Sequence, residues 1–179
     1  MITITTRILA CAVALTAFGG VAYAENPMVG GAAMYADKNI VENAMNSKDH
    51  TTLVAAVKAA GLVETLQGPG PFTVFAPTNA AFEALPAGTV DTLLKPENKD
   101  KLTKVLTCHV VGADAMSDAI GKMIKDDGGT HPVKTVGGCT LQAKMDGDKI
   151  TLTDETGGVA TVTIADVDQS NGVIHVIDK

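Results

Sequence analysis

The sequence has no tryptophan and a single arginine, and its formal net charge is −6. From residue 25 onward the chain carries 13 Lys against 20 Asp and Glu, so this part has a net charge of −7. Binding to a phosphate backbone needs a basic surface, usually with arginines for bidentate contacts. We therefore expect no nucleic-acid partner and no binding to anionic membrane surfaces.

The residue patterns of hydrolytic catalysis are also missing. Beyond residue 24 the serines are Ser47, Ser117 and Ser170, and none of them lies in the G-x-S-x-G turn of a serine hydrolase. Carboxylates occur in three pairs, each in a predicted turn where Asp bonds its own backbone: Asp146 with Asp148, Asp154 with Glu155, and Asp166 with Asp168. We therefore expect a protein that is not an enzyme.

No spacing typical of a metal or cofactor site is present. The histidines form no H-x3-H, H-E-x-x-H or Cys/His zinc pattern; they are His50, His109, His131 and His175. His109 and His175 lie in apolar segments, where a neutral imidazole hydrogen-bonded to the backbone is the usual arrangement. We expect no metal ion and no cofactor.

Residues 1–24 have the layout of a secretory signal peptide. A short polar start with Arg7 is followed by an apolar run over residues 8–18 and by the tripeptide Ala22-Tyr23-Ala24. A transmembrane helix needs about 20 apolar residues, and Gly19-Gly20 interrupts this run. We expect cleavage after Ala24, a periplasmic or secreted location, and no membrane insertion of the remaining chain.

Cleavage leaves two cysteines, Cys108 and Cys139, in a compartment where disulfides persist. One intramolecular pairing is possible, and the loop of about 32 residues that it closes corresponds to roughly 3.7 kcal/mol in the chain-entropy model. The alternative is two separately buried thiols.

The rest of the chain divides into an arm and a single folded domain. Residues 25–38 contain Gly and Pro without sustained periodicity and are expected to form an N-terminal arm. Helical spacing then dominates over residues 40–46, 51–60, 79–85, 89–94, 98–107 and 116–124, with short strands at 72–76 and 108–111. From residue 141 the period changes to two, which predicts antiparallel strands and a last strand over 173–178. Helices followed by hairpins predict an α+β fold.

Two segments resemble the motifs of the fasciclin domain family, and a third short segment lies between them. The first segment supplies Phe72, Thr73, Val74, Phe75, Ala76, Pro77, Thr78, Asn79 and Phe82, the second Asn171, Gly172, His175 and Asp178, and the intervening segment His109. The family has a Tyr before that central histidine, whereas this chain has Cys108, a departure that favours the disulfide.

The resemblance covers about residues 39–179 and implies a fasciclin-type β-wedge, in which two small sheets meet at an angle and are wrapped by helices. Family members usually continue for a few apolar residues past the last strand, whereas this sequence stops at Lys179. The final strand is therefore expected to be shorter, or the sequence to be truncated.

The resemblance further implies an exported, non-catalytic binding or adhesion module of a bacterium, acting on a cell-surface or matrix protein or polysaccharide. We expect the motif residues mainly to specify the fold, with a sheet edge or the helix around residues 80–84 as candidate binding faces. The alternative is a periplasmic small-ligand or stress-related carrier, with Met116, Met123 and Met145 lining a pocket between sheet and helices.

Overall fold

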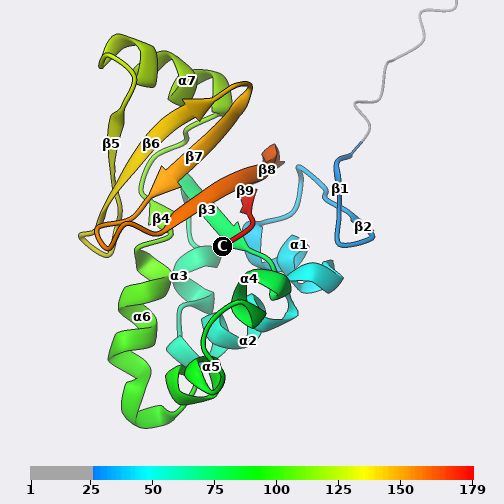
Figure 1. Cartoon of the computed structure of the whole chain (residues 1–179). Coiled ribbons are helices and arrows are strands. Elements are labelled where there is room, and N and C mark those ends of the chain that lie inside the picture. The colour runs from blue at the N-terminus through cyan, green and yellow to red at the C-terminus, as the bar shows by residue number, and fades with distance from the viewer. Residues whose placement is uncertain (1–25) are drawn as a thin grey trace, which may run out of the picture.

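The computed structural model describes residues 26–179, which form a helical half beside a strand-rich half (Figure 1). The predicted signal peptide, residues 1–24, lies outside the described residues. The helices are α1 (Ile40–Asn46), α2 (Thr51–Ala60), α3 (Val63–Gln67), α4 (Asn79–Glu83), α5 (Thr89–Leu93), α6 (Lys99–Thr107) and α7 (Ser117–Asp126), with 3₁₀ turns η1 (Lys48–His50) and η2 (Pro96–Asn98). The strands are β1 (Met28–Val29), β2 (Ala32–Ala33), β3 (Phe72–Pro77), β4 (Val110–Val111), β5 (His131–Lys134), β6 (Thr140–Asp146), β7 (Lys149–Thr153), β8 (Val159–Gln169) and β9 (Gly172–Ile177).

Local sequence signals set the ends of the first two helices. Asn39 and Glu42 form a capping box at the start of α1, because each side chain accepts a hydrogen bond from the other residue's backbone N–H. Helix α2 ends at Gly61, which adopts the left-handed conformation with φ 75°. Both ends agree with the sequence-based prediction.

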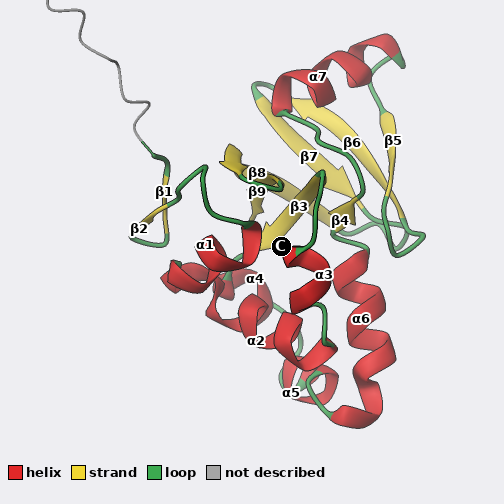
Figure 2. Ribbon diagram, turned by 180° about the vertical axis from the view of Figure 1, so that it is seen from behind, coloured by secondary structure: helices red, strands yellow, loops and turns green. Residues whose placement is uncertain are grey.

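Seven strands form a mixed sheet in the order β4-β3-β9-β8-β7-β6-β5. Strands β3 and β9 are parallel, and the other neighbouring pairs are antiparallel. Strand β8 connects the two parts of the sheet. Its first residues pair with β7, and the remaining residues pair with β9 across two register shifts. These irregularities bend β8 and divide the sheet into two parts at an angle (Figure 2). The predicted α+β class and the angle between two parts of the sheet are thereby confirmed.

Asp166 and Asp168 lie inside strand β8, so the prediction of a turn at this pair is wrong. Asp166 adopts φ 57°, the left-handed conformation, within the second register shift of β8, between Ile164 and Val167. Asp tolerates this conformation better than most residues. The turn-like sequence therefore produces a bulge within a long strand.

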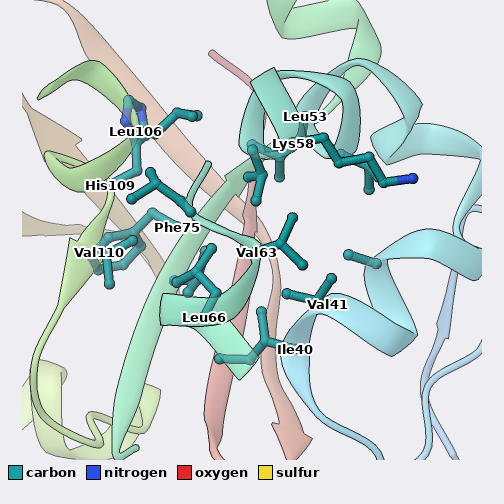
Figure 3. A pocket seen from close by; sticks show the side chains of 15 residues that line it. Ile40, Val41, Leu53, Lys58, Val63, Leu66, Phe75, Leu106, His109 and Val110 are labelled. Atoms are coloured by element: carbon teal, nitrogen blue, oxygen red, sulfur yellow. The ribbon is translucent and has the colours of Figure 1, made fainter. Parts of the chain in front are cut away.

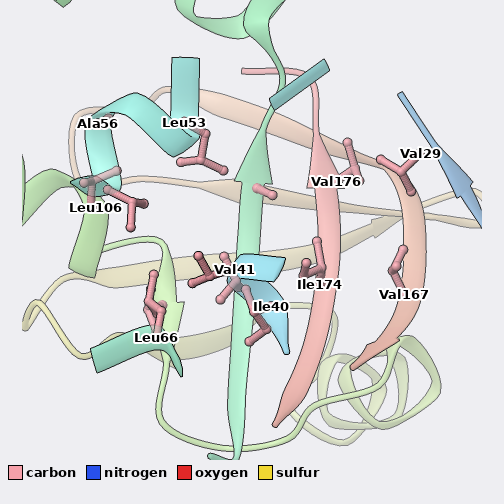
Figure 4. Packing of buried hydrophobic residues seen from close by; sticks show 14 of the residues in the cluster. Val29, Ile40, Val41, Leu53, Ala56, Leu66, Leu106, Val167, Ile174 and Val176 are labelled. Atoms are coloured by element: carbon pink, nitrogen blue, oxygen red, sulfur yellow. The ribbon is translucent and has the colours of Figure 1, made fainter. Parts of the chain in front are cut away.

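The two faces of the β3–β9 pair belong to two separate hydrophobic cores. Val74 and Ile174 face the helices α1, α2, α3 and α6, while Phe75 and Ile177 pack in the second core with Ile120 of α7. Figure 4 shows the first core, with residues of α1 and α2 lying over the central strands. Burial on both faces accounts for the almost uninterrupted apolar sequence of β9.

The two edges of the sheet are protected against further strand pairing in different ways. The loop after β5 covers β4, because the Val136 N–H donates to the Val110 carbonyl at 2.7 Å. A disulfide joins Cys108 to Cys139 beside this contact, with 5.3 Å between the Cα atoms. The other edge strand, β5, contains Pro132, which removes a backbone donor.

The N-terminal arm is more ordered than its sequence predicts. Strands β1 and β2 form a small antiparallel hairpin beside α1 (Figures 1 and 2). Val29 and Met34 are 4% and 2% exposed and belong to the first core. The Lys48 N–H donates to the Gly30 carbonyl at 3.2 Å and fastens the hairpin to η1. The arm therefore completes the core.

The β8–β9 turn connects distant parts of the chain through Asn171. Its side-chain amide donates to the Leu66 and Gly68 carbonyls at 2.8 and 3.0 Å, and its side-chain oxygen accepts from the Ile40 N–H at 3.1 Å. The next residue, Gly172, has φ 151°, and a Cβ atom there would lie 1.9 Å from the Phe72 carbonyl oxygen. Only glycine fits this approach of β9 to β3.

We expect Gly172→Ala to lower the free energy of unfolding by about 3 kcal/mol, because the new methyl group must displace the backbone of β3. Urea denaturation measures the change. Gly121→Ala is the matched control: this helical glycine has room for a Cβ, whose nearest neighbour beyond the helix backbone is the Met145 Sδ at 3.8 Å. It should raise stability by about 0.5–1 kcal/mol. Similar effects at the two positions would contradict the close approach at Gly172.

Candidate functional site

An apolar cavity lies between the helices and the sheet (Figure 3). Its enclosed space measures about 40 Å³, and about 570 Å³ with the open space around its mouth. Helices α1, α2, α3 and α6 and strands β3 and β4 build its wall, which consists of Ile40, Val41, Ala44, Leu53, Val54, Val57, Lys58, Leu62, Val63, Leu66, Val74, Phe75, Leu106, His109 and Val110. Such a wall suits an apolar molecule.

The two polar residues in this wall do not direct their charge or hydrogen bonds inward. Lys58 is exposed, and its ammonium group points away from the cavity in Figure 3. The Nδ1 of His109 lies 2.8 Å from the Val105 carbonyl, to which a neutral ring donates. Burial lowers the pKa of His109, against the smaller opposing effects of this carbonyl and of Asp154. A molecule in this cavity would therefore make apolar contacts, without an ion pair or hydrogen bond to Lys58 or His109.

The predicted methionine lining is wrong. Met116, Met123 and Met145 belong to or lie beside α7 and β6, on the side of the second core, and none of them borders the cavity. Met116 and Met145 are each 37% exposed. The helical and alternating spacing of these methionines reflects how α7 and β6 pack. The sequence alone does not show where these two elements lie relative to the cavity.

A serine, an aspartate and a histidine meet at the start of α7, but their hydrogen bonds differ from those of a catalytic triad. The Ser117 hydroxyl and backbone N–H both donate to the Asp166 carboxylate. The Asp166 N–H donates to Nδ1 of His175 at 3.2 Å, and Nε2 lies 2.8 Å from the Ala115 carbonyl. The serine thus bonds to the aspartate instead of the histidine, and both ring nitrogens are occupied.

His175 is a structural residue of the central strand pair. It is fully buried, and its ring stacks on Phe75 with 5.7 Å between the centroids. Burial lowers its pKa more than the Ala115 carbonyl, Asp166 and Asp114 raise it. The neutral ring, with Nε2–H as the donor, joins β9 to the segment before α7. This arrangement matches the expectation of a neutral imidazole bonded to the backbone.

The polar residues of the first motif also bond within the fold. The Thr73 hydroxyl donates to the Ala113 carbonyl at 2.6 Å and accepts from the Ala115 N–H at 2.9 Å. Thr78 caps α4 through the Ala81 N–H. Asn79 accepts from the Thr52 N–H at 3.0 Å and thereby joins α4 to α2. These side chains connect elements and are not available to a ligand.

The apolar motif residues divide between the two cores. Phe72, Val74, Ala76 and Phe82 pack in or against the first core, and Phe75 lies in the second. Pro77 ends β3 in register with Ile177. Asp178 follows the last residue of β9 and accepts from the Thr161 N–H of β8 at 2.7 Å.

Within residues 26–179, no group of three or more His, Cys, Asp or Glu side chains is placed to hold a metal ion. The structure also contains, in the same range, no helix long and apolar enough to cross a membrane. The sequence suggested a pocket between sheet and helices but could not identify its wall, which combines ordinary core residues from six elements. Only the three-dimensional arrangement leaves a space between them.

We expect the free energy of unfolding to fall as the pH drops below about 6.5. Burial lowers the pKa values of His50, His109 and His175 from the ordinary 6.5, so the unfolded chain binds protons first and gains stability relative to the folded chain. Urea titrations at pH 7.5 and 5.5 measure this loss, and titrations at pH 7.5 and 8.5 should agree. Equal stability at pH 7.5 and 5.5 would contradict the assignment of buried neutral imidazoles.

Comparison with known proteins identifies the fold and the family. The fasciclin domain model matches residues 48–179. Protein sll1483 of Synechocystis is 50% identical over 155 residues, which cover 87% of this chain and 79% of that protein. The transforming growth factor-beta-induced protein ig-h3 of Sus scrofa is 37% identical over 126 residues, which cover 70% of this chain and 16% of that protein.

A solved structure supports the same assignment at the level of the fold. The FAS1 domain pair of the insect cell adhesion molecule Fasciclin I matches with a TM-score of 0.69 and 15% identity, over 79% of this chain and 49% of that one. This chain therefore spans about half of the domain pair. From the sequence match over most of its length, the chain belongs to the fasciclin domain family.

Proposed function

We propose that this protein is an exported, non-catalytic binding module that attaches to a bacterial cell surface or to a surrounding matrix. The family, whose members are often related to adhesion and are generally non-enzymatic, supports this function. The observation that carries it is the hydrogen-bonding of the motif residues. Thr73, Asn79, Asn171 and His175 all bond within the fold, so these motif residues fix its shape and are not free to react.

The surface around the disulfide is the region that we assign to the partner. Val105 and Val136 are 42% and 55% exposed. Val105 lies one helical turn before His109 and bonds to it, and Val136 bonds to Val110 of the adjacent strand. Exposed apolar side chains held on a backbone fixed by the Cys108–Cys139 disulfide suit protein or polymer contacts. The acidic net charge argues against a polyanionic partner.

We expect labelled protein, residues 25–179, to be retained saturably on intact cells or envelope polymers. Val136→Glu should weaken retention about fivefold, because a charge then faces the partner in place of an apolar contact. Met45→Glu is the matched control, since Met45 is also 55% exposed but lies on α1, across the molecule from β4 (Figure 1). A reduced and denatured sample sets the background. Retention that is absent, or equal to this background, would contradict the adhesion function.

The cavity supports a second function, that of a carrier for a small apolar molecule. The wall places fifteen residues around a space that is partly open, and on the side of α2 and α3 its residues Val54, Leu62 and Val63 are partly exposed. Carrier function requires such an opening as well as an apolar interior.

A carrier should retain its molecule through purification without denaturant. Native mass spectrometry should then show an added mass that collisional activation removes, because apolar contacts weaken in the gas phase. The denatured protein serves as the control and should show the mass of the chain alone. The mass of the chain alone in the native sample would argue against the carrier function.

A further inference from the structure

The turn between β8 and β9 ends in Asn171-Gly172, the one Asn-Gly pair in the sequence. Asparagine is a chemically labile residue because its side-chain amide can be lost from an intact chain. A following glycine makes this loss easier, since it has no side chain to hinder attack by its own backbone nitrogen. The pair is therefore the position in this chain at which deamidation is least hindered by the sequence itself.

The fold requires both residues of this labile pair. Gly172 lies against β3 without space for a Cβ atom. The Asn171 side chain donates to the Leu66 and Gly68 carbonyls and accepts from the Ile40 N–H. A carboxylate of the same length can accept but cannot donate, so only the amide makes all three bonds. Replacing either residue to avoid the labile sequence would weaken the attachment of β9.

Deamidation of this pair needs no reagent other than water. The Gly172 nitrogen loses its proton and attacks Cγ of Asn171, so that an N–Cγ bond forms, the Cγ–Nδ2 bond breaks and ammonia leaves with the proton. Water then opens the resulting five-membered imide at either of its two carbonyl carbons. One opening leaves an aspartate, and the other leaves an isoaspartate, in which the main chain runs through the side-chain carboxyl carbon.

The fold restrains both reacting groups. Nδ2 is the atom that leaves, and its hydrogen bonds to the Leu66 and Gly68 carbonyls, at 2.8 and 3.0 Å, must break first. The attacking nitrogen belongs to the peptide unit whose carbonyl, that of Asn171, accepts from the Phe72 N–H at 3.1 Å. Gly172 is itself buried. The reaction therefore requires the turn to detach from β3 and from the helices.

We propose that Asn171 is a deamidation site that the folded protein protects and that opening of the β3–β9 pair exposes. Deamidation is slow compared with opening and closing of a fold. Its rate therefore follows the fraction of chains in which β9 is detached from β3. This proposal concerns the chain's own chemistry and is independent of what its surface binds.

The modification removes the attachment that protected the site. A carboxylate at position 171 would place its oxygens against the Leu66 and Gly68 carbonyls, which are acceptors left without their donor. An isoaspartate lengthens the main chain by a methylene group directly before β9 and disturbs its register with β3. A chain that is modified while it is open is thus hindered from closing again, and unfolding becomes irreversible.

Peptide mass spectrometry tests the protection on residues 25–179, incubated at pH 8.5 either folded or unfolded in guanidinium chloride. We expect the peptide that contains Asn171 to deamidate at least about tenfold faster in the unfolded sample. A synthetic peptide of residues 167–176 is the control for the solvent, since it has no fold to protect it and should react equally fast with and without denaturant. Equal rates in folded and unfolded protein, or no reaction in the unfolded protein, overturn the proposal.

Two valine variants test whether the reaction depends on opening of the strand pair. Val176→Ala shortens a side chain of β9 that is 2% exposed, and it should speed deamidation at least about tenfold in guanidinium chloride just below the wild-type unfolding transition. Val159→Ala is the matched control, because Val159 is 47% exposed, and it should leave the rate unchanged. Equal rates in the two variants would overturn the dependence on opening.

Refolding of the aged, unfolded sample tests the consequence of the modification. After removal of guanidinium chloride, the folded fraction should contain fewer deamidated chains than the sample as a whole. The directly made variant Asn171→Asp should unfold at a lower urea concentration than the wild type. If deamidated and unmodified chains refold equally well, or if Asn171→Asp is as stable as the wild type, the modification does not make unfolding irreversible.

Discussion

The parallel pairing of β3 with β9 is the interaction on which the rest of the structure depends. It joins residues 72–77 to residues 172–177 in continuous register, across 100 positions of the sequence. Both faces of the pair are covered, by the helices on one side and by α7 with the strand meander on the other. The helical half and the meander therefore pack on the same two strands, and neither has a complete core without them.

The motif residues make this long-range pairing possible. Gly172 lets β9 approach β3, and Asn171 binds the backbone of α1 and of α3 at the same end. At the other face, Thr73 and His175 hold the segment before α7. Because the polar groups of the motifs make these intramolecular hydrogen bonds, they are not available to bind a partner. A family built on such motifs can share a fold while its binding surfaces differ.

The sequence predicts the elements whose signals are local. The capping box at Asn39, the left-handed Gly61 and the alternation after residue 141 all correspond to observed structure. Helix α3 was missed because it is five residues long and lacks a side-chain cap, and Asn171 binds its carbonyl end from the other end of the domain. Strand β5 was missed because it contains Pro132, which an edge position tolerates. Neither the cavity nor the bulge at Asp166 has a local signal.

Hydrogen exchange of the backbone amides tests the central role of the β3–β9 pair most directly. If the pair organises both cores, its amides should exchange only through global unfolding and give the highest protection free energies in the chain. Amides of β5, β6 and β7 should exchange through smaller openings, because these strands depend on β8 for their attachment to the pair. Faster exchange in β3 and β9 than in the meander would contradict the account.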